Sequence, residues 1–397
     1  MKRTINSFLY GFTLISLLAG CSNIQLSGGS SCIPANVTTG YDLNLRRQDE
    51  TNVPRRKPMP SWWEPQLNET QVNRMRQASL FDVVIRFGNE IWLASYADDL
   101  GNSIVRYHID TSDIKAYGVI DENGNGYVAG NLFVTHDGNL WARFITNQEY
   151  SLLAWYDSQK DEFRIITDQD GLLAPPVDIK ITWNGRTQPV IDETPDGNLV
   201  VAINGEIYVY NPKTNQAKRV LEREKRLNIN SIAVAQDGHV WFTTSNELSI
   251  RELDPTNGVI WDYGPPSSAV ADDPTNLFSL VSKAIEIDRI GRVWVSDFGW
   301  LEHNQEARYV WHSLVRSPIF ISIYDPEYEY LWIRPDAIYQ FSDGKMWYSS
   351  GIGIVRFDVQ TGEWCWSATV SGPLAEDASG NLWLVANGQI YKYMLRP

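Results

Sequence analysis

Histidine and cysteine, the side chains that most often ligate metals or act as acid, base or nucleophile, are scarce in this chain of 397 residues. The five histidines are His108, His136, His239, His303 and His312. None of them has the short spacing of a zinc motif. His136 and His239 flank Asp-Gly pairs and are expected to be exposed turn residues. His303 and His312 are close enough to share one structural unit, which leaves a ligand or catalytic role open for them.

One loop has the beginning of a calcium-binding pattern. Asp121, Asn123 and Asn125 alternate ahead of Gly126, as oxygen ligands do in the first half of a calcium loop. The twelfth position is Leu132, where a bidentate Glu would belong. We therefore expect a plain turn and no cofactor, with Ca²⁺ as the one ion worth testing.

The cysteines indicate export. Lys2-Arg3 precedes an apolar run over residues 8–18, and Leu18-Ala19-Gly20-Cys21 follows. That order is typical of a secretory signal peptide, and eleven apolar residues are too few to span a bilayer. The last four residues resemble the lipobox of bacterial lipoproteins. The resemblance implies removal of residues 1–20, acylation of Cys21 and anchorage to an extracytoplasmic membrane face, on the outer membrane where the organism has one.

Cys32 and Cys365 are the other two cysteines. In an exported protein such a pair favours a disulfide, with two free buried thiols as the alternative. The net charge of −14 argues against binding to nucleic acid or to anionic lipid headgroups. We expect a monomer.

A short phrase recurs seven times and sets the fold: a glycine turn, a spacer, an apolar residue and usually Trp. Its last residues are Trp92, Trp141, Val200, Trp241, Trp294, Trp347 and Trp383. The glycine supplies the positive φ of a tight hairpin, and the residues after it suit a pleated strand. Further short strands before and after each phrase give four antiparallel strands per unit, which is the composition of a propeller blade.

The sequence therefore predicts an all-β, seven-bladed β-propeller over residues 77–397, preceded by residues 21–76 as lipidated tether, closing strand and linker. Residues 343–364 resemble two-component-regulator propeller repeats and, more loosely, streptogramin lyase and other NHL-like repeats. The resemblance implies the fold and leaves the activity open.

The lyase resemblance can be checked by residue, because that family carries a glutamate three positions after a motif Trp, together with a histidine pair. These positions hold Ser95, Phe144, Ile203, Thr244, Asp297, Ser350 and Ala386. Asp297 is the only acid among them, and no histidine pairing is evident. A metal-dependent lyase or hydrolase with acids around Asp297 is the alternative function.

The seventh unit ends with a strand over residues 389–393 and lacks a fourth strand. We expect the N-terminal segment to close the ring, and the alternating residues 40–46 are the candidate strand. A bridge from Cys32 to Cys365 would fasten this segment beside the seam.

Propellers usually bind at the funnel formed by the starts of the inner strands and the ends of the second strands. The polar residues expected there are Asn204, Asn230, Lys283, Asp297, Asp336 and Asn387. This mixed ring suits hydrogen bonding to a ligand, with a solvated rim as the alternative. The sequence therefore favours a non-catalytic, membrane-tethered recognition module for a protein partner or a glycan.

Overall fold

The computed structural model describes the chain in segments of one or two strands, with the turns that join or flank them. The segments are residues 33–34, 38–39, 61–68, 80–95, 102–119, 126–145, 151–166, 190–203, 205–222, 229–244, 250–263, 284–295, 299–303, 309–313, 323–325, 328–331, 335–350, 353–367, 372–386 and 389–395. Within these segments there is no helix, and so none long and apolar enough to cross a membrane.

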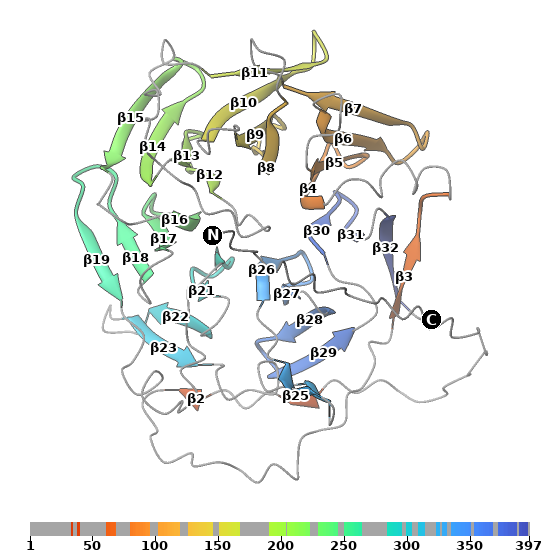
Figure 1. The fold of residues 1–397 in the computed structure, drawn as a ribbon. Helices are drawn as coiled ribbons and strands as arrows, with labels where there is room; N and C mark the ends of the chain where they lie inside the picture. Colours follow the sequence, from red (N-terminus) through yellow and green to blue (C-terminus); the bar gives the residue numbers. More distant parts are fainter. Residues whose placement is uncertain are drawn as a thin grey trace, which may run out of the picture.

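Seven antiparallel sheets surround one centre (Figure 1). Blade 1 contains β4 (Leu80–Arg86), β5 (Glu90–Ser95), β6 (Asn102–His108) and β7 (Ile114–Gly118). Blade 2 contains β8 (Val128–Val134), β9 (Leu140–Ile145), β10 (Ser151–Asp157) and β11 (Glu162–Ile165). Blade 3 contains β12 (Ile191–Glu193), β13 (Leu199–Ile203), β14 (Glu206–Asn211) and β15 (Gln216–Leu221). Blade 4 contains β16 (Ile229–Val234), β17 (Val240–Thr244), β18 (Ile250–Leu253) and β19 (Ile260–Tyr263).

The remaining blades use strands from both ends of the chain. Blade 5 contains β20 (Ile285–Ile287), β21 (Val293–Val295), β22 (Gly299–His303) and β23 (Tyr309–Ser313), with β2 (Thr38–Thr39) as a fifth strand. Blade 6 contains β26 (Pro335–Gln340), β27 (Met346–Ser350), β28 (Gly353–Asp358) and β29 (Glu363–Ser367), with β1 (Ile33–Pro34) as a fifth strand. Blade 7 contains β30 (Leu374–Glu376), β31 (Leu382–Ala386), β32 (Gln389–Leu395) and β3 (Ser61–Pro65). The prediction of a seven-bladed propeller of four-stranded blades is confirmed.

The recurring phrase performs the same two tasks in every blade. Its seven glycines all have φ between 72° and 87°, a conformation in which a side chain would be strained. The Trp or Val that follows is buried between blades, with at most 4% of its surface exposed. In four blades a carboxylate of the turn region accepts a hydrogen bond from the indole N–H, as Asp288 does from Trp294 at 2.8 Å. In these four blades the acid therefore supplies an acceptor to an indole N–H that is buried with its ring.

Neighbouring blades are fastened at their turns. The last residue of an inner strand accepts a hydrogen bond from a backbone N–H in the turn of the preceding blade. Glu193 accepts from His136 at 2.7 Å, Gln340 from Arg289 at 2.8 Å, and Glu376 from Ser342 at 2.7 Å. These bonds hold adjacent sheets at a fixed spacing.

An N-terminal segment closes the ring, as predicted. The prediction that residues 40–46 form the closing strand was wrong. β3 pairs with β32 from Ser61↔Leu395 to Pro65↔Tyr391, whereas residues 40–46 lie outside the described segments. The Gln389 side chain accepts from the backbone N–H of Leu67 at 2.7 Å and donates to its carbonyl at 2.9 Å. β3 lies beside β32 and takes the outer position of blade 7 (Figure 1).

The stretch around residues 300–330, whose strands the sequence did not place, contains β22, β23 and a separate hairpin. The hairpin pairs β24 (Ile323–Asp325) with β25 (Tyr328–Leu331) and forms its own two-stranded sheet between blades 5 and 6 in the chain.

Candidate functional site

The two ends of the ring are built differently. At one, the turn end, tight turns join first to second strands and third to fourth strands. At the other, the funnel end, inner strands begin and second strands finish. Of the residues expected on the funnel rim, Asn230 and Asp336 lie in β16 and β26. Asn204, Lys283, Asp297 and Asn387 lie outside the described segments.

Four inner strands interrupt their pairing at the same place. The register with the second strand skips one residue in β4, β8, β16 and β26. The skipped residues are Phe81, Gly130, Asn230 and Asp336. A β-bulge leaves its extra residue out of the ladder and turns its side chain in a new direction, a device common beside binding sites. We name these four positions the bulge ring; both described residues of the predicted rim belong to it.

Blade 2 fills its position in the bulge ring with a side chain from the second strand. Gly130 has no side chain, and a Cβ there would come within 3.2 Å of Nη2 of Arg143. The guanidinium of Arg143 therefore lies over the inner strand at the bulge. Burial lowers the pKa of Arg143 to about 10, and the charge of Asp82 opposes that shift. Its buried Nε has no hydrogen-bond partner among the described residues.

Asp82 joins blade 1 to blade 2 next to this arginine. Its Oδ2 accepts from the backbone N–H of Leu132 at 2.8 Å, and its Oδ1 accepts from that of Val83 at 2.9 Å. Burial raises the pKa of Asp82 to about 7, against the effect of these hydrogen bonds and of Arg143. Near neutral pH this carboxyl is therefore divided between its two protonation states.

Blades 3 and 5 carry acids with a related role. Asp192 accepts from the backbone N–H of Val234 in blade 4 at 2.6 Å, and Glu286 accepts from the backbone of Gln340 in blade 6. Burial raises the pKa of Asp192 to about 6. Burial, with the charge of Asp192 as the next cause, raises the pKa of Glu286 to about 8. In blade 4, Ser231 does the same with a neutral side chain and accepts from Ile285 at 3.3 Å.

These acceptors have a common physical reason. The inner strand is the edge of its sheet nearest the channel, so its outward N–H groups lack a ladder partner. A side chain from the preceding blade supplies the acceptor.

A small recess opens between blades 3 and 4 at the funnel end. Its lining residues are Gly205, Leu221, Glu222, Ile229, Phe242, Thr244 and Arg251. The hydroxyl of Thr244 in this lining is fully buried and has no hydrogen-bond partner within the part of the chain that the structure describes. Buried hydroxyls without partners are costly, so this recess has unused hydrogen-bonding capacity.

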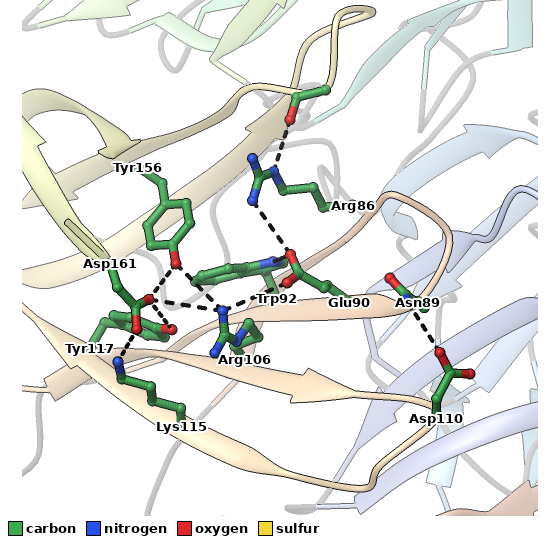
Figure 2. Close-up of polar contacts among 11 residues, drawn as sticks. Arg86, Asn89, Glu90, Trp92, Arg106, Asp110, Lys115, Tyr117, Tyr156 and Asp161 are labelled. Atoms are coloured by element: carbon green, nitrogen blue, oxygen red, sulfur yellow. Dashed lines mark hydrogen bonds and ion pairs between the residues drawn. The ribbon is translucent and has the colours of Figure 1, made fainter. Parts of the chain in front are cut away.

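A second polar cluster lies at the turn end, between blades 1 and 2 (Figure 2). Asp161 from blade 2 accepts from the hydroxyl of Tyr117 at 2.8 Å and also bonds to Lys115 and Tyr156. Partial burial acts to raise the pKa of Asp161, but these hydrogen bonds hold it at about 2. Arg106 bridges the cluster to Glu90 at 3.6 Å.

Arg86 extends this cluster from Glu90 to the turn of blade 2. Figure 2 shows Arg86 pointing from Glu90 toward blade 2, where its Nε donates to the carbonyl of Gly138 at 2.8 Å. Arg106 also lies 5.5 Å from the ring centroid of Trp92. The groups in this cluster satisfy one another, so we interpret it as a fastening between blades.

Three of the histidines contact neighbouring side chains, and we interpret these three as structural. His136 is exposed as expected and bonds to Glu193 at 2.7 Å. His239 is partly covered instead of exposed, because it bonds to Glu252 at 2.7 Å and stacks on Trp261. His312 stacks on Trp300 at 4.8 Å and contacts Glu302 at 3.1 Å, and burial lowers its pKa.

Four of the positions at which a lyase glutamate would be expected hold side chains that are buried in the core. Phe144, Ile203, Thr244 and Ala386 are all buried, with at most 6% exposed. Asp297 lies outside the described segments, as do Asp121, Asn123 and Asn125 of the calcium-like loop. Within the described residues, no three His, Cys, Asp or Glu side chains are grouped as metal ligands would be.

Comparisons with known proteins identify the fold and no family. No protein-family model matches the chain, and no curated sequence does. Virginiamycin B lyase from Staphylococcus aureus aligns with a TM-score of 0.55 at 13% identity, over 80% of this chain and 94% of the lyase. The extracellular domain of a hybrid two-component system from B. thetaiotaomicron aligns with a TM-score of 0.52 at 12% identity, over 80% of this chain and 40% of that one.

A mitotic checkpoint complex chain aligns as well, with a TM-score of 0.51 at 10% identity over 89% of this chain and 97% of that one. Proteins this different share only the propeller architecture with the chain, and function depends on sites that vary on such folds.

Sequence reasoning missed Arg143, Asp82, Asp192 and Glu286. The available signal was an ionisable residue inside an otherwise apolar strand: Arg143 comes two residues after the motif Trp141, and Asp82 lies within Phe-Asp-Val-Val. The residues that the sequence analysis singled out at the ends of the second strands lie three or four positions after the motif Trp or Val, one or two positions beyond that of the arginine at Gly130.

Proposed function

We propose that this chain is a non-catalytic, extracytoplasmic recognition propeller that binds a glycan at the bulge ring of its funnel end. The observation that carries the proposal is the repeated bulge with Arg143 folded over Gly130. Four inner strands give up a ladder position at the same level, and one of these positions presents a guanidinium whose Nε has no partner among the described residues. Such groups are the means by which a propeller would hold the oxygens of a ligand.

Within the described segments this end exposes no large apolar side chain, which supports a glycan over a protein partner. Protein interfaces are usually centred on large apolar or aromatic anchors. Among described residues, the exposed large apolar side chains are Phe87, Ile290, Val259 and Trp261. Phe87 and Ile290 belong to turns at the turn end, and Val259 and Trp261 to the outer edge of blade 4. The overall negative charge further favours a neutral or weakly charged glycan over a polyanion.

The test is a glycan array screen with the mature protein, followed by calorimetry on any glycan that binds. Arg143→Ala should weaken binding at least tenfold, which corresponds to about 1.4 kcal/mol for one lost charged hydrogen bond. Arg164→Ala is the matched control, because Arg164 is an exposed arginine on the outer strand of the same blade. Equal affinity of the Arg143→Ala variant and the wild type would refute the site. Capture of a protein with no glycan binding would favour a protein partner.

The membrane tether is a separate part of the proposal. It is supported by the lipobox-like residues Leu18 to Cys21, which lie outside the described segments. Two or more acyl chains on Cys21 would hold the propeller at a bilayer. Labelled palmitate should enter the wild-type protein and not the Cys21→Ser variant, and that variant should leave the membrane fraction. Membrane association without a label on Cys21 would contradict lipid anchoring.

A further inference from the structure

Two very short strands attach the N-terminal segment to the outside of the ring. β1 pairs with β29 through Ile33↔Trp364 and Pro34↔Glu363, and β2 pairs with β23 through Thr38↔Ser313 and Thr39↔His312. Each pairing has only two residues per strand. Such short edge pairings have few hydrogen bonds to offset the entropy of ordering the chain.

The register of β1 against β29 points to a covalent fastening. In an antiparallel ladder, each step back along one strand is a step forward along the other. Ile33 is opposite Trp364, so the residue before Ile33 would meet the residue after Trp364. Those residues are Cys32 and Cys365. Cys365 belongs to β29, where it pairs with Arg356 on the other side, and Cys32 lies outside the described segments.

Geometry permits a bond at such a position. Directly opposite residues of an antiparallel pair have Cα atoms about 4.5–5.5 Å apart. Disulfides require about 4.4–6.8 Å between Cα atoms. We propose that Cys32 and Cys365 form a disulfide that fastens the N-terminal segment to the outer strand of blade 6. The register supports this pairing independently of the argument from export that first suggested it.

The oxidation needs a partner, which we take to be the active-site disulfide of an extracytoplasmic thiol oxidase. One cysteine thiolate attacks that disulfide, forms a mixed disulfide and releases one oxidase thiolate. The second cysteine thiolate attacks the mixed disulfide and releases the other. The two cysteines lose two electrons and two protons, and the oxidase disulfide is reduced to a dithiol.

If Cys21 carries the proposed lipid, the disulfide would also set how far the propeller can move from the membrane. Cys32 is eleven positions after Cys21, which gives a reach of at most about 40 Å. Without the bond, the first long pairing with the ring begins at Ser61, and the same estimate gives about 140 Å. The disulfide thus turns a long tether into a short one while β3 alone closes the ring.

The test is alkylation of the exported protein in denaturant, before and after reduction, with mass spectrometry of the tryptic peptide 357–392 that contains Cys365. In denaturant a free thiol reacts even if it is buried in the fold, whereas a disulfide does not. We expect at least tenfold less alkylation of Cys365 before reduction than after it. The Cys32→Ser variant should be fully alkylated at Cys365 without reduction and should keep the intrinsic fluorescence of the folded ring.

Two results would overturn the proposal: complete alkylation of both thiols in the unreduced wild type, or a Cys365 that stays blocked in the Cys32→Ser variant. Because the readout is at Cys365, it does not depend on whether Cys21 carries lipid. A failure of the anchor and a failure of the bridge are therefore distinguishable.

Discussion

Replacing Asp82 by Asn should change how the stability of the propeller depends on pH. The pKa of Asp82 is raised by burial from 3.8 to about 7 in the folded protein. The fold therefore prefers the protonated carboxyl. Its contribution to stability is complete below the unfolded pKa and is lost as the pH rises from 3.8 through about 7.

The size of the effect follows from the shift. Between about pH 4.5 and pH 8, a shift of this size removes about 3 kcal/mol from the free energy of unfolding. Because Asp82 is only half-buried, solvent screening reduces this figure, and we expect about 1–3 kcal/mol. Asn cannot ionise, so the Asp82→Asn variant should gain that amount relative to the wild type across the same range.

The variant has a cost that does not depend on pH. One oxygen becomes an amide nitrogen, so a hydrogen bond to Leu132 or Val83 is lost, worth about 1 kcal/mol. The variant should be less stable than the wild type in acid and equal or more stable in mild alkali. Ser231→Ala is the control, because it removes a comparable acceptor from Ile285 without removing an ionisable group.

Urea unfolding, followed by the fluorescence of the Trp residues at both pH values, measures these differences. Charges elsewhere in the protein cancel, because variant and wild type share them. If the difference between Asp82→Asn and the wild type is the same at both pH values, the carboxyl is not held in the environment described here. The control should lose about 1 kcal/mol at both.

Three further outcomes can be measured by the same unfolding assay. Trp294→Phe should destabilise by about 1–2 kcal/mol more than Trp141→Phe, because Trp294 donates to Asp288 while the Nε1 of Trp141 has no partner among the described residues; equal losses would contradict the role given to the acid. Gln389→Ala should cost about 1–3 kcal/mol through both hydrogen bonds to Leu67, and a neutral result would show that this contact does not help to close the ring. Gly372→Ala should be far more damaging than Gly238→Ala, since a Cβ at Gly372 would meet the carbonyl oxygen of Val385 at 1.9 Å while Gly238 has open space and a strained φ alone.

The fold was predictable because each blade repeats one local solution. Glycine at the turn and Trp three or four residues later specify a hairpin and a large wedge between sheets, and these tasks need no long-range information. Val200 shows the limit of the pattern: it lacks the indole, yet its blade forms and it is fully buried. Seven weak signals at similar spacing were enough to fix the number of blades.

The closing strand was mispredicted because alternation is a poor guide at an outer edge. Residues 40–46 alternate apolar and polar side chains, whereas Ser61–Pro65 presents two adjacent Trp and ends in Pro. An edge strand tolerates Pro, and its partner needs only a compatible backbone. What selects β3 is the contact of Leu67 with Gln389, 322 residues away in sequence, which no local pattern reveals.

Two of the residues predicted for the funnel rim, Asn230 and Asp336, lie in the bulge ring. Asn230 and Asp336 each lie eight residues before the glycine of their turn, as Gly130 does, and this regular spacing is visible in the sequence. The bulge at those positions, and Arg143 in the space left by Gly130, depend on how two strands pair and so appear only in three dimensions.

Stability and recognition meet at the inner edges of the sheets. An inner strand needs acceptors for its N–H groups, and Asp82, Asp192 and Glu286 supply them from the blade before. In the recognition function proposed above, the interruption of the ladder at Gly130 would present groups toward a ligand. The pKa of Asp82 is about 7, so its charge changes with pH near neutrality. That charge acts on the guanidinium of Arg143. Protonation of Asp82 should therefore alter both the stability of the ring and the electrostatic environment of Arg143 at the funnel.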